Sequence, residues 1–239
     1  MADSLGDRIK HYERCWQAGF PPNSPVLIRV DGKAFHTWTR GFDRPFDHHL
    51  IDAMVAATRA TAKEMQGFKL AYTQSDEATF LICDTDSHEQ QGWFGYELNK
   101  IISVSASVFT AHFNDIAQSW THRSQPPLAF FDARAFLVPA DDVPNAFIWR
   151  QRDWERNSVS MCAHYHFSHS ELQGKKNSEM QEMLWTRARL NWAHLDPILK
   201  NGTFVLKSGT LLHNKIGYDD LKALIAAATP DTAGAVTSG

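Results

Sequence analysis

Apolar positions recur along this chain with two different periods, and their order predicts the architecture. Apolar runs typical of strands cover residues 26–30, 69–73, 78–83 and 128–138. Apolar residues at helical spacing predict helices over residues 5–17, 47–67 and about 94–115. Asp47 has the side chain of an N-cap residue and stands at the start of the second of these helices. From residue 26 onward the predicted order is β-α-β-β-α-β, which is the ferredoxin-like split motif of α+β proteins.

The region after this motif is predicted to be mainly helical. We expect a helix over residues 144–165, a second around 178–191 and one strand over 202–207. The chain is therefore divided into a core over 1–140, a helical accessory region with one added strand over 141–228, and a tail over 229–239. The tail is rich in Ala, Thr and Gly and has no pattern of core positions, so we expect it to be disordered.

Composition narrows the class of protein and its location. The 239 residues are enough for one large domain, and 43% of them are hydrophobic, which is typical of a well-cored globular protein. The net charge of -3 gives no overall basic field, so any contact with nucleic acid has to come from local patches. Three widely separated cysteines, a polar N-terminus and the lack of an apolar run of roughly 20 residues predict a cytoplasmic protein without disulfides or membrane spans.

Two acidic clusters carry the candidate chemistry. Asp31-Gly32 follows the first predicted strand, and Ser75-Asp76-Glu77 lies in the turn between the second and the third. Asp and Gly are common in turns, so each cluster alone is explained by its turn. In the split motif, however, the third strand packs beside the first, which brings both clusters to one edge of the sheet. Mg²⁺ is typically held by one or two carboxylates plus substrate phosphates, so Asp31 and Asp76 predict a shared site for Mg²⁺ and nucleoside triphosphates.

Three more residues of these clusters are candidates for roles in the same site. The Gly32 carbonyl is a further metal ligand, because glycine lets the backbone approach closely. Glu77 either assists the site or caps the turn, and the Ser75 hydroxyl donates to a phosphate or to the turn backbone. A separate group of Cys and His residues within 162–169 matches no common zinc module, since most structural zinc sites take their ligands from two separated segments.

A triphosphate also needs cations and a surface for its base. The candidate cations are Lys33, Arg44 and Lys100, although each of them taken singly is also typical of a solvated surface. Phe35 and His36 are candidates for stacking on a base, whereas an aromatic ring is more often part of a core. The sequence contains no P-loop and no Gly-x-Gly-x-x-Gly fingerprint that would offer another nucleotide site.

Five short segments form an ordered series of motifs. Residues 29–36 read Arg-Val-Asp-Gly-Lys-Ala-Phe-His, and residues 71–77 read Ala-Tyr-Thr-Gln-Ser-Asp-Glu. The other segments of the series are residues 100–109, 131–134 and 149–153. In this order they resemble the motifs of the tRNA-histidine guanylyltransferase family and its 3′-to-5′ polymerase relatives. The resemblance extends from the first helix to about residue 207.

The resemblance implies a palm-like catalytic core over residues 1–140, similar to that of DNA polymerases, with two Mg²⁺ ions held by Asp31, the Gly32 carbonyl and Asp76. It implies a nucleotidyltransferase that adds nucleotides, preferably GTP, to the 5′ end of tRNA after activation of a 5′-monophosphate with ATP or GTP. Residues 31–36 with Ser75 and Asp76 would bind the triphosphate, and Asn157 matches the family's His-Ile-Asn-Asn stretch. Family members are commonly tetrameric, so a homo-oligomer is also implied.

Three positions differ from the eukaryotic members of this family. Residues 94–97, Phe-Gly-Tyr-Glu, stand in place of a basic pair, Arg44 stands where many members have Lys, and residues 155–158 read Glu-Arg-Asn-Ser. These differences resemble the bacterial and archaeal relatives, which often repair truncated tRNA 5′ ends against a template strand. Addition of a single G to tRNA-histidine and templated repair of the 5′ end are therefore both open.

Two other functions are compatible with the sequence. A palm-fold nucleotide cyclase uses the same fold and paired aspartates, and the fold alone does not decide the function. A non-catalytic RNA-binding module would need a local basic patch. The candidate residues for that patch are Arg150, Arg152, Arg156, Lys175 and Lys176.

Overall fold

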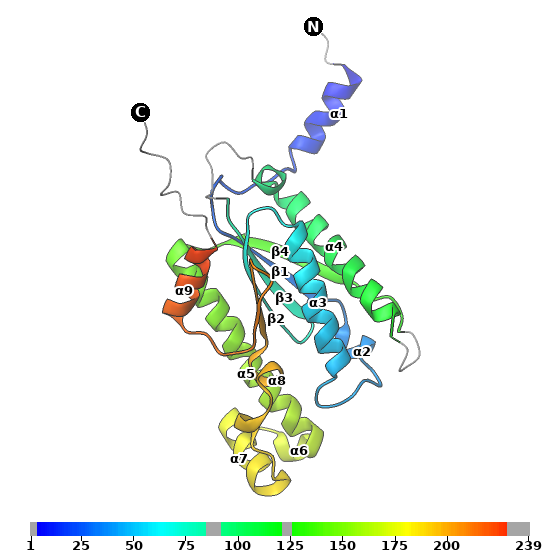
Figure 1. Ribbon diagram of the computed structural model, residues 1–239. Coiled ribbons are helices and arrows are strands. Elements are labelled where there is room, and N and C mark those ends of the chain that lie inside the picture. Colours follow the sequence, from blue (N-terminus) through cyan, green and yellow to red (C-terminus); the bar gives the residue numbers. More distant parts are fainter. Residues whose placement is uncertain (1–3, 85–91, 121–125, 229–239) are drawn as a thin grey trace, which may run out of the picture.

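The structure is a computed structural model, and it describes residues 4–84, 92–120 and 126–228. An antiparallel sheet of six strands lies at its centre, in the order β4-β1-β3-β2-β5-β6 (Figure 1). The strands are β1 (Val26–Gly32), β2 (Phe68–Gln74), β3 (Glu77–Ile82), β4 (Phe131–Leu137), β5 (Thr203–Leu206) and β6 (Leu211–Leu212). The first four strands have the order 4-1-3-2, which is the order of the predicted ferredoxin-like motif.

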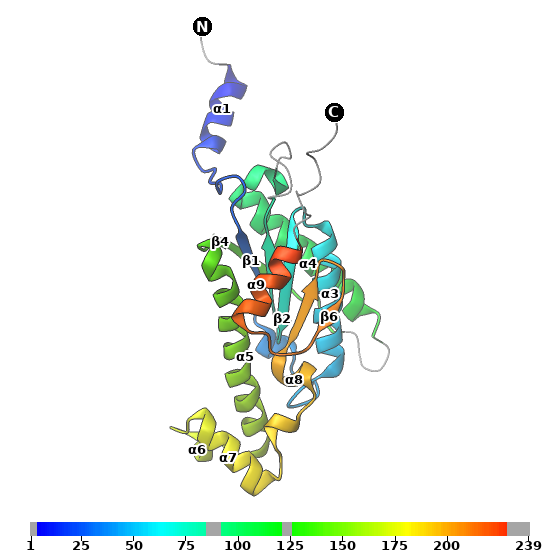
Figure 2. The same cartoon turned by 60° about the vertical axis from the view of Figure 1, so that its left-hand side comes forward.

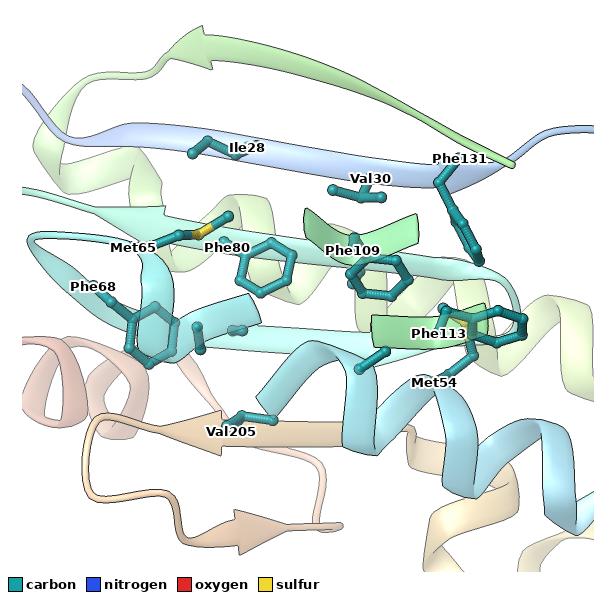
Figure 3. Close-up of a cluster of buried hydrophobic side chains, with 14 of the residues drawn as sticks. Ile28, Val30, Met54, Met65, Phe68, Phe80, Phe109, Phe113, Phe131 and Val205 are labelled. Atoms are coloured by element: carbon teal, nitrogen blue, oxygen red, sulfur yellow. The ribbon is translucent and has the colours of Figure 1, made fainter. Parts of the chain in front are cut away.

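Helices cover both faces of this sheet. On one face lie α3 (His48–Glu64) and α4 (Leu98–Gln118), and on the other lie α5 (Val143–His166) and α9 (Tyr218–Ala227) (Figures 1 and 2). Successive side chains of a strand point to opposite faces. In β1, Ile28 and Val30 therefore join Phe109 of α4 in one apolar core (Figure 3), whereas Leu27 joins Phe147 of α5 in the other.

The two long helices of the motif, α3 and α4, lie where the sequence pattern predicts them, but α4 starts later than expected. The Asp47 side chain accepts a hydrogen bond from the Leu50 amide at 2.9 Å, so its predicted role as the N-cap of α3 is confirmed. The second helix was expected from about residue 94, but α4 begins at Leu98. Residues 93–96 form a separate 3-10 turn, because Phe94 and Gly95 have positive φ angles of 51° and 61° that an α-helix does not allow.

The sheet continues into the C-terminal region. Strand β5 pairs with β2 and β6 pairs with β5, so two strands are added where the sequence predicted one. Strand β6 has only two residues and is too short to show a period. Strand β5 lies in the predicted accessory region but belongs to the same sheet as the core, so the sheet itself does not mark a boundary. The proposed boundary at residue 140 stays a prediction. The expected disordered tail lies outside the described residues.

Smaller helices complete the described part of the chain. They are α1 (Leu5–Arg14), α2 (Phe35–Trp38), α6 (His169–Leu172), α7 (Asn177–Ala188) and α8 (Pro197–Asn201). The far end of α5 extends beyond the sheet and packs with α6 and α7 around a third apolar cluster that includes Val159, Cys162 and Leu184 (Figure 2). Of the helices described, none has the length and apolar character needed to cross a membrane.

Candidate active site

A pocket of about 850 Å³ opens at the end of the sheet where β1 finishes and β2 turns into β3. This volume lies within the range of small-molecule sites. Four segments form its walls: the end of β1 with α2, the loop into α3, the β2–β3 turn, and the second half of α5. The sequence-predicted residues that line it are Asp31, Gly32, Ala34, Phe35, His36, Arg44, Ser75 and Asp76.

The pairing of β1 with β3 brings the two acidic clusters together. In this antiparallel pair Asp31 lies opposite Glu77, and the Gly32 amide donates a hydrogen bond to the Asp76 carbonyl at 3.0 Å. Asp31 and Asp76 both line the pocket. The prediction that strand order would bring these two carboxylates to one edge of the sheet is therefore confirmed.

The β2–β3 turn holds Asp76 in a strained two-residue loop. Strand β2 ends at Gln74 and β3 begins at Glu77, so Ser75 and Asp76 form the whole connection. Ser75 has a φ of 50°, which is uncommon for a residue other than glycine. Its hydroxyl donates to Asp76 Oδ1 at 3.0 Å. The hydroxyl therefore donates to the neighbouring carboxylate and not to the turn backbone, and its role toward a phosphate stays a prediction.

The loop after β1 is anchored by the ring of Phe35. This ring is 4% exposed and packs on Trp38, Phe113 and Phe131 with centroid distances of 4.9, 5.8 and 5.0 Å. Of the two roles considered for Phe35, the structure therefore shows the core role, because the ring is part of the aromatic core. The exposed side chain of His36 remains a candidate for that contact.

Gly32 is required by the close approach of the Phe35 ring. A Cβ atom at position 32 would lie 2.6 Å from Phe35 Cε2 and 2.7 Å from its Cγ. We expect Gly32→Ala to lower the free energy of unfolding by about 1–3 kcal/mol, since a packed core resists added volume, and to reduce activity by displacing the loop. Gly6→Ala, on the exposed helix α1 where the nearest atom lies at 3.8 Å, is the control and should be at least as stable as wild type in urea unfolding. Equal stability of the two variants would contradict this account of Gly32.

Burial and charge make the Asp76 carboxylate a candidate cation ligand. Burial raises the pKa of Asp76, the hydrogen bond from Ser75 opposes this shift, and the charge of Asp31 adds to it. Two carboxylates that share a partly dry pocket are stabilised by a cation placed between them. Among the described residues no three His, Cys, Asp or Glu side chains form a ready-made metal cluster, including those near Cys162. Asp31 and Asp76 thus fit Mg²⁺, which keeps several of its positions for phosphate and water.

Arginines on the α5 side of the sheet neutralise the carboxylates that adjoin the pocket. Arg134 of β4 lies 3.8 Å from Asp31 Oδ2 and 3.4 Å from Asp132 Oδ1. Its side chain is half exposed, so the ion pair with Asp31 is screened by solvent. Arg29 of β1 lies 3.8 Å from Glu77. The metal-ligand candidate Asp31 is therefore held by a weak and reversible ion pair.

Glu77 is bound by an arginine that arrives from α5. Arg150 donates to both carboxylate oxygens of Glu77, at 2.6 and 2.8 Å, and also to Asp153 at 2.9 Å. Burial raises the pKa of Glu77, whereas the charges of Arg150 and Arg29 lower it. Glu77 does not line the pocket, and this contact favours a positioning role for it over direct assistance to the reaction.

Three of the predicted ligand residues are not brought to the pocket. Lys100 pairs with Glu97 at 3.2 Å, near the start of α4 and at the opposite end of β1 from Asp31 (Figure 1). Asn157 donates to Asp153 at 3.5 Å, and Lys33 has an exposed side chain outside the lining. Their roles in nucleotide binding stay predictions.

Ion pairs with neighbouring carboxylates leave fewer unpaired cations in the predicted basic patch. Arg150 is committed to Glu77 and is mostly buried, so it does not belong to a solvated surface. Arg156 pairs with Asp153 at 2.8 Å, and Lys175 pairs with Glu179 at 3.4 Å. These ion pairs weaken the case for an RNA-binding module without catalysis.

Sequence reasoning missed the wall of the pocket that α5 supplies. Trp154, Ser160, Met161, His164 and Tyr165 line this wall. The indole N–H of Trp154 is buried and has no hydrogen-bond partner within the described chain, so it is a donor available to a ligand. No local pattern points to these residues, because their place depends on how α5, a helix that begins more than 110 positions after Asp31, packs. Arg134 lies within the motif series and could have been found there, whereas Arg150 was considered only as part of a basic patch.

The antiparallel β-α-β-β-α-β sheet and the pocket with paired carboxylates describe an α+β protein with a candidate nucleotide site at one end of its sheet. The model of the tRNAHis guanylyltransferase (Thg1) family matches residues 6–139, which is more than half of the chain. The chain therefore belongs to the tRNAHis guanylyltransferase family.

Individual proteins agree with this assignment. The chain is 26% identical over 231 residues to the probable tRNA(His) guanylyltransferase of Drosophila melanogaster, covering 90% of this chain and 77% of that protein. A bacterial Thg1-like protein solved in complex with ATP is 38% identical, with a TM-score of 0.89, and the match covers 95% of this chain and all of that one. A bacterial Thg1-like protein in complex with GTP is 34% identical, with a TM-score of 0.76 and coverage of 95% and 99%.

Proposed function

We propose that this protein is a Mg²⁺-dependent nucleotidyltransferase that adds nucleotides, GTP by preference, to the 5′ end of tRNA in the 3′-to-5′ direction. The observation that carries the proposal is that Asp31 at the end of β1 and Asp76 in the β2–β3 turn of this family member line one pocket of nucleotide size. The bacterial relatives solved with ATP and with GTP support both triphosphates as substrates.

The reaction has two transfers, and both use the same pocket. First, a 5′-monophosphate oxygen of the RNA attacks the α-phosphorus of ATP or GTP, and pyrophosphate leaves. The 3′-hydroxyl of the incoming GTP then attacks the activated 5′ phosphate and displaces the nucleoside monophosphate. A new phosphodiester bond therefore forms at the 5′ end, and the added nucleotide keeps its own triphosphate.

Residues of the polymerase-type palm position these groups. Asp31, the Gly32 carbonyl and Asp76 would hold two Mg²⁺ ions, which when bound activate the attacking oxygen and stabilise the leaving pyrophosphate. Arg44 lines the pocket beside them and binds the phosphates. The first amides of α2 have no acceptor within their helix, so they are further donors for a phosphate oxygen. Ser75 keeps the Asp76 carboxylate in place through its 3.0 Å hydrogen bond.

Templated repair of truncated 5′ ends is favoured over strict addition of one G. In place of the eukaryotic basic pair, Tyr96 is buried and its hydroxyl accepts a hydrogen bond from the Asp84 amide at 3.1 Å. Glu97 is paired with Lys100. The similarity to bacterial Thg1-like proteins agrees with this choice. We further propose a cytoplasmic homo-oligomer, by analogy with the family's tetramers, with the tRNA 5′ end as partner.

The product of the reaction tests this proposal. The protein is incubated with Mg²⁺, ATP, α-³²P-labelled GTP and a 5′-monophosphorylated tRNA that lacks its first nucleotide. We expect label in the RNA, restored length at the 5′ end, and no cyclic nucleotide. An RNA whose opposing template strand is removed should gain less label. Cyclic GMP formed without RNA would instead establish the cyclase alternative, and bound RNA without label would establish the binding module.

A further inference from the structure

A small cavity lies between α3, α5, α8 and the end of β2. Its volume is about 20 Å³, which is enough for one water molecule. The polar residues of its wall include Gln74 of β2 and Trp154 of α5, whereas the hydroxyls of Thr73 and Thr203 are already bonded within the protein. Trp154 also lines the candidate active site, so the cavity and the active-site pocket share a wall.

Gln74 and Trp154 each bury a polar atom that the described chain does not satisfy. The two side chains are 7% and 4% exposed. Neither Oε1 of Gln74 nor the indole Nε1 of Trp154 forms a hydrogen bond with a described residue. An indole N–H only donates and an amide oxygen only accepts, so the two atoms are complementary. Leaving both without a partner would be unfavourable, because each has lost its contact with bulk water.

Strand pairing and helix spacing place the two side chains on facing surfaces. Gln74 lies on the same face of β2 as Tyr72, which belongs to the apolar core beneath α5. Gln74 is also directly opposite Glu77 in the hairpin. The carboxylate of Glu77 is bound by Arg150, and Trp154 lies about one turn after Arg150 on α5. Gln74 and Trp154 therefore meet where α5 crosses the end of the hairpin.

We propose that one ordered water molecule occupies this cavity and bridges Trp154 to Gln74. The indole N–H donates to the water oxygen, and the water donates to Oε1 of Gln74. Buried waters typically make two to four hydrogen bonds to polar groups that are otherwise unsatisfied, and these two groups meet that requirement. The cavity volume selects water over any nucleotide group, which would need a much larger space.

The bridge connects α5 to the turn that carries Asp76. Gln74 directly precedes Ser75 and Asp76, which form the whole connection between β2 and β3. A Gln74 side chain held by the water restricts this turn, so Gln74 and Trp154 act as positioning residues. This consequence for catalysis rests on the proposed function, whereas the water site itself does not.

A crystal structure at about 1.6 Å resolution or better tests the water directly. We expect a density peak about 2.5–3.2 Å from both Trp154 Nε1 and Gln74 Oε1. Trp154→Phe keeps an aromatic ring without the N–H, and in this variant the peak should weaken or disappear. A wild-type structure with no peak between the two atoms, or with a direct hydrogen bond between them, would overturn the proposal.

A double-mutant cycle measures the coupling in solution. Trp154→Phe and Gln74→Met should each raise the equilibrium constant of unfolding at least about tenfold, because each leaves one end of the bridge unsatisfied. The double variant removes both polar groups, so its loss should be smaller than the product of the two single factors. Trp149→Phe makes the same change at a 53% exposed position of α5 and should stay near wild type. Losses that multiply fully would overturn the bridge.

Nucleotide transfer tests the positioning role. Gln74 does not line the large pocket, so Gln74→Met should lower kcat for GTP incorporation severalfold while KM for GTP changes little. An unchanged kcat, or a loss confined to KM, would overturn this role. A wild type that transfers no nucleotide would contradict the proposed function instead, and the crystal structure and the unfolding cycle would still decide the water site.

Discussion

Asp76→Asn and Asp31→Asn, made separately, are expected to reduce nucleotide transfer to RNA by at least about a hundredfold to a thousandfold. Asparagine keeps the size and shape of the side chain, but it is neutral and does not replace a carboxylate as a ligand for a hard cation. The assay is the incorporation of labelled GTP into 5′-truncated tRNA. Asp52→Asn makes the same chemical change at an exposed position of α3 outside the pocket lining and should keep wild-type turnover.

The loss of activity in Asp76→Asn should not come from unfolding. Burial raises the folded-state pKa of Asp76 above its ordinary value of 3.8. The stability that this shift contributes is complete below the unfolded pKa and is lost as the pH rises through the folded pKa. At pH 7–8 without metal, Asp76→Asn should therefore be at least as stable as wild type in urea unfolding. A variant that unfolds more easily, or one that turns over normally, would contradict the role given to Asp76.

Arg150→Met is expected to have the largest effect on stability, with a loss of about 2–4 kcal/mol, because it leaves Glu77 buried without its main partner. Activity should fall as well, since Arg150 ties α5 to the hairpin that carries Asp76. Arg152→Met, two positions along the same helix and exposed, is the matched control and should change the free energy of unfolding by less than about 0.5 kcal/mol.

A double variant separates the charge of Glu77 from the packing of Arg150. Arg150→Met with Glu77→Gln removes both charges, so it should recover more than half of the stability lost in the single variant. Arg150→Lys should be intermediate, because lysine keeps the charge but not the two parallel hydrogen bonds. Urea unfolding of wild type, Arg150→Met, Glu77→Gln and the double variant measures the coupling. Additive losses would show that Arg150 and Glu77 act independently.

Much of the fold follows from the sequence because its strands are strongly patterned. The split motif could be predicted because its strand periods and helix periods alternate clearly, and Asp47 was identifiable from its residue type alone. The meeting of Asp31 with Asp76 was predictable as well, since the motif fixes which strands are neighbours. These inferences use local periodicity and a topological rule, and neither needs side-chain packing.

Other features depend on packing that no local pattern records. Lys100 was chosen for its charge and its motif, but the direction of α4 puts it at the far end of the sheet from the pocket. From the sequence, the ring of Phe35 could either stack on a base or belong to a core. In the structure it packs within the aromatic cluster. The contact of Arg150 with Glu77 joins positions 73 residues apart, so it could be found only in three dimensions.

The central claim is that Asp31 and Asp76 hold the metal and the triphosphate that react with the RNA 5′ end. A crystal structure of the protein with GTP and Mn²⁺ tests it most directly, because anomalous scattering locates the ions. We predict peaks about 2.1 Å from carboxylate oxygens of Asp31 and Asp76 and from phosphate oxygens of the nucleotide, as expected for an ion that takes the place of Mg²⁺. A triphosphate bound outside this pocket, or ions that touch neither carboxylate, would contradict the claim.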